Sequence, residues 1–425
     1  MKTQLVEDEI LDMMKLEKQY GIFNNNMMMI LSNEDKAYVE GLQRLCLEQE
    51  EKIGGIHGHN NADYYDWFEW AGSHGLINRS NDYPHRDDLR IGMKAEILRC
   101  WTMDIFNPQF NMALGASVLA VNPIAHHHDD RDGLLKDLAD LLDGKKIGCI
   151  GITEPLRGSD AVNMQVKAEK VDGGYTINGI KCYTTNSPKA DLCAVYAVLN
   201  EEDTRGTMIQ GVSHRKGEWD RGFVAERIGI PSVSKVHIGK TIFEDAFIPD
   251  DYITGGPGEG YHILFEGLVP ERIGIAATNV GQMWGAFALA SLYSTVRKQF
   301  GEKILRHQAV GMSVLAKYHS RLMSITMALL KLAEAYDAKR EELEGISPFM
   351  NPFVAMASQM KEQAAMLVHE LTYECMHAMG GTGVTDQTKM PIIQGVSEIA
   401  EVVGGTRNVQ LLIGSRTINT MVKMI

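Results

Sequence analysis

The chain has 425 residues, of which 44% are apolar and 23% charged, so it is long enough for a large core and roughly two or three domains. Its 42 basic and 55 acidic residues give a net charge of −13, which excludes the basic field that proteins binding nucleic acids or anionic membranes non-specifically present. No apolar stretch has the length of a membrane span and the acidic N-terminus lacks the pattern of a secretory signal, so we expect a soluble, cytoplasmic protein.

The first third of the chain is predicted to be helical. An N-terminal extension of residues 1–33 precedes a helical domain over residues 34–146. Within that domain, residues 133–142 carry leucines at the three-to-four spacing that places them on one face of a helix.

Residues 147–254 have a different period. Polar and apolar residues alternate over residues 165–169, and Gly-containing turn signals follow at residues 172–174 and 178–179. Residues 194–199 form a short apolar run typical of a buried strand. The pattern predicts a middle domain of antiparallel strands, ending in a Gly- and Pro-rich linker.

The remaining residues, 255–425, return to helical spacing. Four long helices are predicted, over residues 264–300, 315–336, 354–378 and 394–424. Such a bundle can hold a cofactor between facing helices. The fold class is therefore α+β, with a helical domain, a β domain and a helical bundle in that order.

The clearest chemical signal lies at the start of the β domain, where residues 151–160 read GITEPLRGSD. Backbone N–H groups and two hydroxyls in such a loop suit an anion or a heteroaromatic ring. A loop punctuated by proline and glycine for structural reasons alone has the same composition. Taken by itself, the segment leaves both interpretations open.

Other motifs follow this loop in a defined order. They are NGIKCYTTN at 178–186, IFEDAFIP at 242–249, PER at 270–272, RKQFG at 297–301, GGTG at 380–383 and GTRNVQ at 405–410. In order and spacing the set resembles the acyl-CoA dehydrogenase family, over nearly the whole chain from about residue 34. The resemblance implies an acyl-CoA dehydrogenase-like fold, bound FAD, and a homotetramer in which a neighbouring subunit completes each site.

The resemblance also implies which residues bind FAD. Those from the same chain are Ile150, Ile152, Thr153, Gly158, Ser159, Tyr183, Thr184 and Thr185, with the Thr185 hydroxyl as donor to the flavin nitrogen that receives hydride. Those from the neighbouring subunit are Arg297, Lys298, Gln299, His307 and Gln308 at the pyrophosphate and adenosine, with Phe300 and Ile304 also in the cofactor-binding set. The cofactor site is closed by His377, Gly380, Gly381, Thr406 and Asn408.

The catalytic base is expected to be a carboxylate, because a thioester α-proton is weakly acidic. Many family members carry this Glu directly before the late Gly-Thr pair, where this chain has Gly404. Glu271 stands where isovaleryl-CoA and long-chain relatives carry theirs, and the resemblance implies that it is the base. A carboxylate in the first turn of a helix also has a purely structural explanation through the helix dipole.

The substrate contacts follow from the same resemblance. Arg272 and Ser159 are expected at the CoA moiety, and Gly404 and Gly405 beside the acyl group. The missing side chain at Gly404 predicts space for a branched or alicyclic acyl group. The chain departs from the family pattern at two positions. Tyr183 stands where relatives often have Trp, and Val269 stands where an acidic residue is frequent in the CoA contact.

The predicted reaction is therefore FAD-dependent α,β-dehydrogenation of an acyl-CoA thioester, with an electron-transfer flavoprotein as acceptor. Two alternatives stay open. One is an O₂-using acyl-CoA oxidase or flavin monooxygenase of the same fold, and the other is a non-catalytic flavoprotein that has lost its base.

A metal site is not expected. The three consecutive histidines from His126 to His128 are possible metal ligands, but consecutive residues point in different directions. A solvated loop or helix start explains the run better. The six cysteines are scattered without a Cys-x-x-Cys pair, which predicts free, buried thiols.

Overall fold

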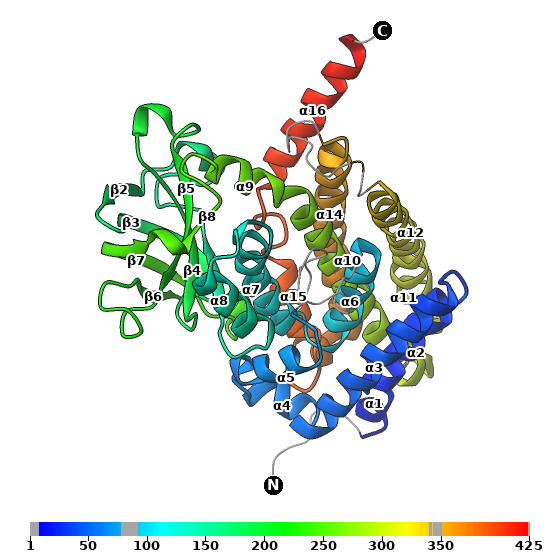
Figure 1. Ribbon diagram of the computed structural model, residues 1–425. Coiled ribbons are helices and arrows are strands. Elements are labelled where there is room, and N and C mark those ends of the chain that lie inside the picture. The colour runs from blue at the N-terminus through cyan, green and yellow to red at the C-terminus, as the bar shows by residue number, and fades with distance from the viewer. Residues whose placement is uncertain (1–7, 78–91, 340–341, 343–350, 424–425) are drawn as a thin grey trace.

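The computed structural model describes residues 8–77, 92–339, 342 and 351–423. A twisted β sheet lies on one side of the molecule and helices from both ends of the chain form a bundle on the other (Figure 1). The predicted α+β architecture is confirmed, with the sheet between the two helical parts of the chain.

The N-terminal part contains eight helices among the described residues. They are α1 (Asp8–Met13), α2 (Leu16–Met27), α3 (Asn33–Ile53), α4 (Ile56–Asn61), α5 (Phe68–Ser73), α6 (Met93–Phe106), α7 (Pro108–His127) and α8 (Asp132–Leu142). The limits of α3 follow from local chemistry, because the Ser32 hydroxyl caps its first turn and Gly54 ends it in a left-handed conformation. Likewise the Asn107 side chain accepts a hydrogen bond from the Phe110 N–H at the start of α7.

The middle part is an eight-stranded sheet. Its strands are β1 (Gly148–Gly151), β2 (Lys167–Val171), β3 (Gly174–Thr185), β4 (Leu192–Val198), β5 (Met208–His214), β6 (Val224–Ile228), β7 (Ile238–Pro249) and β8 (Ile253–Thr254), in the order β6-β7-β3-β2-β4-β5-β8 with β1 beside β4. Most neighbours are antiparallel as predicted, but β4 runs parallel to both β1 and β2. Alternation of side chains does not distinguish parallel from antiparallel pairing, which depends on the connections between strands.

The C-terminal part is built around one long helix. Its elements are α9 (Gly260–Glu266), α10 (Leu268–Val296), the short hairpin β9 (Lys298–Gln299) and β10 (Glu302–Lys303), α11 (Gln308–Val310), α12 (Lys317–Ala338), α14 (Phe353–Met379), α15 (Met390–Ser397) and α16 (Arg407–Lys423). Three of the four predicted long helices correspond to α10, α12 and α14. The prediction of one continuous helix over residues 394–424 is wrong, because Gly404 and Gly405 adopt left-handed conformations between α15 and α16.

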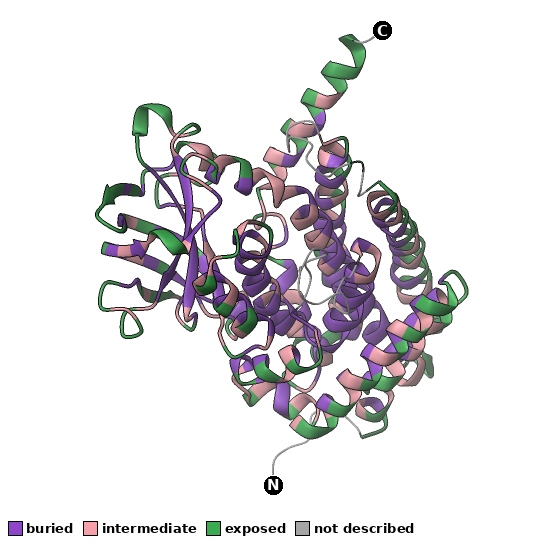
Figure 2. Ribbon diagram, in the orientation of Figure 1, coloured by how far each residue is buried: buried purple, intermediate pink, exposed green. Residues whose placement is uncertain are grey.

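The helical core joins the two ends of the chain. Phe23 of α2 packs edge-on against Trp101 of α6 and Trp284 of α10, with ring centroids 6.3 and 5.5 Å apart. Residues of the N-terminal extension therefore belong to the same core as the C-terminal bundle. Helices α6 and α10 are buried along most of their length and α14 is buried along one face, whereas α16 projects away and is mostly exposed (Figure 2).

Two further predictions can be compared with the structure. All six cysteines are free and buried, as predicted. Over the described ranges, no helix combines the length and the apolar composition that a membrane crossing requires.

Candidate functional site

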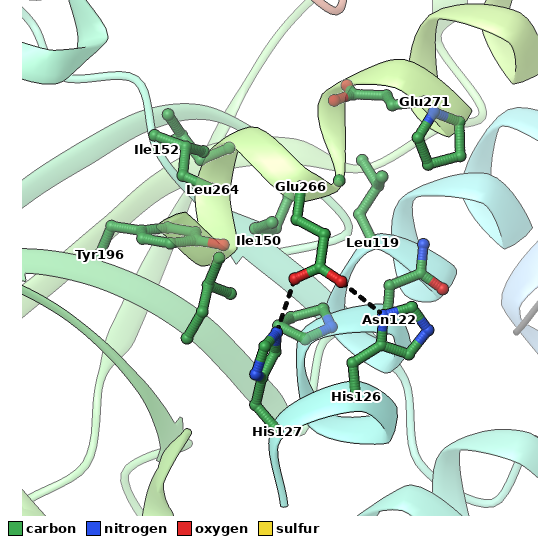
Figure 3. A pocket seen from close by; sticks show the side chains of 14 residues that line it. Leu119, Asn122, His126, His127, Ile150, Ile152, Tyr196, Leu264, Glu266 and Glu271 are labelled. Atoms are coloured by element: carbon green, nitrogen blue, oxygen red, sulfur yellow. Dashed lines mark hydrogen bonds and ion pairs between the residues drawn. The ribbon is translucent and has the colours of Figure 1, made fainter. Parts of the chain in front are cut away.

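The candidate site is a pocket where the junction of α9 and α10 meets α7, β1 and β4 (Figure 3). Its walls are largely apolar, and Glu271 lies at one side of it. The apolar lining residues are Leu119, Pro123, Ile150, Ile152, Ile263, Leu264 and Pro270. An apolar pocket with a few polar groups is the usual form of a small-molecule site.

Glu271 is the carboxylate predicted as the base. It lies in the first turn of α10, and its backbone N–H donates to the Gly267 carbonyl at 3.1 Å. Burial raises the pKa of Glu271, and the positive charges of Arg272 and Lys361 oppose that rise without cancelling it. A buried carboxylate with a raised pKa beside a pocket has the properties of a general base.

Arg272, expected at the CoA moiety, is 6% exposed. Its Nε atom is buried and has no hydrogen-bond partner among the described residues. Burial lowers the pKa of Arg272, and the neighbouring Glu271 carboxylate opposes this effect. An unsatisfied buried guanidinium nitrogen is costly, so this side chain is suited to an anionic or carbonyl-bearing ligand.

Gly404 contradicts one expectation. A Cβ atom at this position would lie 2.1 Å from Ile275 Cδ1 and 3.3 Å from Glu271 Oε1. The space predicted for a branched or alicyclic acyl group is therefore already filled by the Ile275 side chain. The position nevertheless borders the Glu271 carboxylate, as the motif comparison placed it.

Lys361 of α14 is a site residue that the sequence did not reveal. It is fully buried, its ammonium donates to the Gly405 carbonyl at 2.6 Å, and its charge acts on Glu271. Burial lowers the pKa of Lys361 to about 8, although the Glu271 carboxylate raises it. A lysine inside an amphipathic helix gives no signal of this role, because only the packing of α14 against α10 brings the two charges together.

The motif loop after β1 is held by a buried ion pair. Glu154 and Lys181 pair at 2.8 Å, with both side chains almost fully buried. Glu154 also accepts backbone N–H groups of Gln165 and Val166 at 2.6 and 2.9 Å. Glu154 therefore has a structural role in the motif, and Gly158 and Ser159 remain exposed on the loop.

The segment Tyr183–Thr185 ends β3 beside a register shift against β7. Tyr183 adopts a positive φ of 55° and its ring is 64% exposed, whereas Thr184 is buried. Asn186 then anchors the strand end, accepting from the Tyr65 hydroxyl at 2.7 Å and donating to the Ala113 carbonyl at 2.8 Å. Strain of this kind at a bulge turns a side chain out of the sheet, where it can meet a ligand.

A second group of predicted residues lies at the other end of α10. They surround a cavity of about 520 Å³, lined by Tyr293, Arg297, Gln299, Ile304, Val310, His377, Ala378, Met379, Gly380, Gly381, Thr382 and Thr385. His307 is held nearby, with its Nε2 atom 3.0 Å from the Gln299 carbonyl oxygen. Of the predicted set, Lys298, Phe300 and Gln308 do not line this cavity, and Phe300 is 94% exposed.

Two other predicted residues belong to neither pocket. Thr406 and Asn408 lie where α16 begins, next to Gly405, and the Thr406 carbonyl accepts the N–H of Val409 at 2.9 Å. Their role in closing the cofactor site therefore stays a prediction.

The two groups are far apart. From Glu271 to Arg297 the chain follows the continuous helix α10, a distance of about 39 Å at about 1.5 Å per residue. One chain therefore does not bring all the predicted cofactor residues together.

The three histidines lie at the end of α7 rather than in a loop or at a helix start, since α7 continues through Pro123 to His127. His126 and His127 face Glu266 across the pocket (Figure 3). No group of three metal-ligating side chains occurs within residues 8–77, 92–339 and 351–423.

The residues present suit a flavin dinucleotide. An exposed aromatic face at Tyr183, an open loop at Gly158 and Ser159, and a guanidinium at Arg297 beside two glycines are the groups that a ring system and a pyrophosphate require.

Comparison with known proteins places two segments of the chain in one family. Residues 149–246 match "Acyl-CoA dehydrogenase, middle domain", and residues 258–419 match "Acyl-CoA dehydrogenase, C-terminal domain". The short-chain-specific acyl-CoA dehydrogenase of Clostridium acetobutylicum is 30% identical over 295 residues, which is 68% of this chain and 73% of that protein. The mitochondrial isovaleryl-CoA dehydrogenase of Oryza sativa is 27% identical over 304 residues, or 71% of this chain and 70% of that protein.

Solved structures share the fold. Butyryl-CoA dehydrogenase from Megasphaera elsdenii superposes with a TM-score of 0.80 at 23% identity, over 91% of this chain and 98% of that chain. A structure described as an FAD complex of PigA has a TM-score of 0.79 at 21% identity, over 92% of this chain and 98% of that chain.

Proposed function

The chain belongs to the acyl-CoA dehydrogenase family, and from that premise we propose that it binds FAD and converts an acyl-CoA thioester to the trans-2-enoyl-CoA. The observation that carries the proposal is Glu271, a carboxylate with a raised pKa that borders an apolar pocket. It stands in the Pro-Glu-Arg motif where the base of some family members is expected.

Glu271 acts as the base. Its carboxylate takes the α-proton of the thioester, and burial strengthens its affinity for that proton. The positive charges of Arg272 and Lys361 favour the ionised form of the carboxylate, which is the form that can accept the proton. Without these charges, burial would raise the pKa of Glu271 further.

When bound, FAD supplies the acceptor for the hydride that leaves the β-carbon. Tyr183 offers a ring face and Thr185 a hydroxyl at the end of β3, while Gly158 and Ser159 leave the loop open for ligand contacts. Arg272 is placed to bind the CoA arm, since its buried Nε atom needs a partner.

A second copy of the chain supplies the far half of the cofactor site. The cavity at Arg297 lies about 39 Å along α10 from Glu271, so it serves the site of a neighbour. Helix α16 supports assembly, because it leaves apolar side chains exposed at Leu411, Leu412, Ile418, Met421 and Val422. We propose a homotetramer, with α16 seated against another copy.

The proposal also concerns the identity of the electron acceptor and of the acyl group. An electron-transfer flavoprotein is the electron acceptor that we propose. Gly404 no longer supports the prediction of a branched or alicyclic acyl group, because the Ile275 side chain occupies the space beside this glycine.

Anaerobic flavin bleaching tests the proposal. Purified protein loaded with FAD is mixed with a panel of acyl-CoA thioesters, and loss of flavin absorbance is followed with the wild type and with Glu271→Gln. Bleaching by the wild type that the variant loses supports the mechanism, and equal bleaching by both contradicts it. Fast reoxidation of the reduced enzyme by air would favour an O₂-using oxidase over the dehydrogenase.

A further inference from the structure

One end of the substrate pocket is polar, and the reaction described above does not use its groups. Glu266, the last residue of α9, lines the pocket together with Glu271. Glu271 follows five positions later, in the first turn of α10. The pocket therefore has the proposed base in one part of its wall and a second carboxylate in another.

Two histidines from α7 hold Glu266 in place. His127 Nε2 lies 2.9 Å from Glu266 Oε2, and His126 Nδ1 lies 3.5 Å from Glu266 Oε1 (Figure 3). Burial raises the pKa of Glu266, but the two imidazoles outweigh that effect and hold the pKa well below its ordinary value. The carboxylate is therefore charged at neutral pH, inside a pocket whose walls are otherwise mostly apolar.

Other polar groups converge on the same end. The Tyr196 side chain is 2% exposed, and its hydroxyl points into the pocket toward Glu266 (Figure 3). Asn122 of α7 adds an amide to the lining. A plain hydrocarbon chain makes no use of these groups and would displace water from a carboxylate, which is unfavourable.

The charge of this end indicates which substituent it accepts. A carboxylate accepts hydrogen bonds and repels other anions, so a hydroxyl or amino group is favoured over an acidic one. Each Glu266 oxygen has capacity for a second donor beside its imidazole. The alternative is a purely structural role, in which the Glu266–histidine contacts only join α7 to α9.

We propose that Glu266, with His126, His127 and Tyr196 around it, binds a hydrogen-bond-donating substituent on the acyl chain. The preferred substrates are then short acyl-CoA thioesters that carry a hydroxyl or amino group near the end of the chain. This inference rests on the proposed function, because it places the thioester at Glu271 in the same pocket.

The test compares matched thioesters by anaerobic flavin bleaching. Butyryl-, pentanoyl- and hexanoyl-CoA are each paired with the ω-hydroxy and ω-amino forms. For at least one chain length we expect the wild type to prefer a donor-bearing member by about tenfold to a hundredfold in kcat/KM, the range for a hydrogen bond to a charged group. Glu266→Leu should abolish or reverse that preference, and Glu266→Gln, which keeps an acceptor oxygen without the charge, should reduce it.

A matched control separates selectivity from stability. Glu259→Gln alters an exposed carboxylate just before α9 and should leave the substrate ratios unchanged. Thermal unfolding of all variants is measured in parallel, since a merely structural Glu266 would lower the melting temperature without moving the ratios.

Two outcomes overturn the inference. Preference for the unsubstituted thioesters at every chain length contradicts it, and so does a ratio that Glu266→Leu leaves unchanged. A wild type that bleaches with no thioester refutes the proposed function itself, which is a different result from bleaching without donor preference.

Discussion

The sites at the two ends of α10 differ in how far a single chain encloses them. At the N-terminal end, Glu271 and Arg272 are enclosed by α7, α14 and the sheet, and burial shifts the pKa values of both. At the C-terminal end, Arg297 and Gln299 border an open cavity, and Phe300 is 94% exposed. Under the proposed function, the fold of one chain organises the catalytic groups, and we propose that a neighbouring copy meets the surface that carries Arg297.

Glu271→Gln gives the sharpest test of the N-terminal end. Removing the base should lower the rate of flavin reduction by about 10²- to 10⁴-fold, the usual contribution of a general base. The flavin content should stay at the wild-type level, since the change conserves volume and lies away from Arg297. Stopped-flow absorbance and the FAD-to-protein ratio check both statements, and a loss of FAD together with activity would contradict the separation of roles.

Lys181→Met tests whether the stability of the enclosed part of the molecule depends on a buried ion pair. The change leaves Glu154 buried without its partner at 2.8 Å, and should lower the free energy of unfolding by about 3–5 kcal/mol. Arg306→Ala is the control at the open end, where the pair with Glu302 is exposed and worth about 0–1 kcal/mol. Denaturant unfolding measures both, and similar small losses would show that the Glu154 pair is not important for stability.

Arg297→Ala tests the open end. Loss of a guanidinium at the pyrophosphate should weaken FAD binding by roughly tenfold to a hundredfold, as for a hydrogen bond between charged groups. The same Arg306→Ala variant serves as control because its side chain is 72% exposed and does not line the cavity. Titration of apo-protein with FAD gives the dissociation constants. Equal binding by wild type and Arg297→Ala would exclude this cavity from the cofactor site.

Lys361→Met tests the electrostatics around Glu271 and has the smallest expected effect. The ammonium favours the carboxylate form of Glu271, so its removal raises the pKa of Glu271 and moves the acid limb of the kcat/KM profile to higher pH. We expect a several-fold loss of kcat/KM below neutral pH and a smaller loss above pH about 8, where Lys361 itself is largely neutral.

Lys331→Met, which removes a highly exposed ammonium from α12, should leave the pH profile unchanged. Lys361→Arg should restore the acid limb toward the wild-type position, because it keeps the positive charge. An acid limb that does not move in Lys361→Met would show that this lysine only supports the Gly405 turn.

Much of the fold could be predicted because it depends on local patterns. Helical spacing identified α10, α12 and α14, and turn signals with alternation identified the β domain. The break before α16 was missed, since helical spacing does not show the left-handed turn at Gly404 and Gly405, whose carbonyls accept hydrogen bonds from the Gln410 and Lys361 side chains.

Within the site, motif order predicted roles for Glu271, Arg272 and the cofactor loops, and the structure places Glu271 at a pocket. Lys361, Tyr196 and Glu266 carried no motif, because each lies in an ordinary helix or strand. The prediction of free space at Gly404 was wrong for a related reason. The sequence does not show which neighbouring side chain occupies the space beside a glycine.

The order of the three structural regions, the family and the residue types available for chemistry can all be inferred from the amino-acid sequence, because they depend on local periodicity and on motifs. Which charges share a low-dielectric environment depends on how the helices and strands pack. Glu271 and Lys361 are 90 residues apart in the chain, and Glu266 meets His127 from across 139 residues. Electrostatic interactions depend on distance in space and on burial, and neither is encoded in separation along the chain.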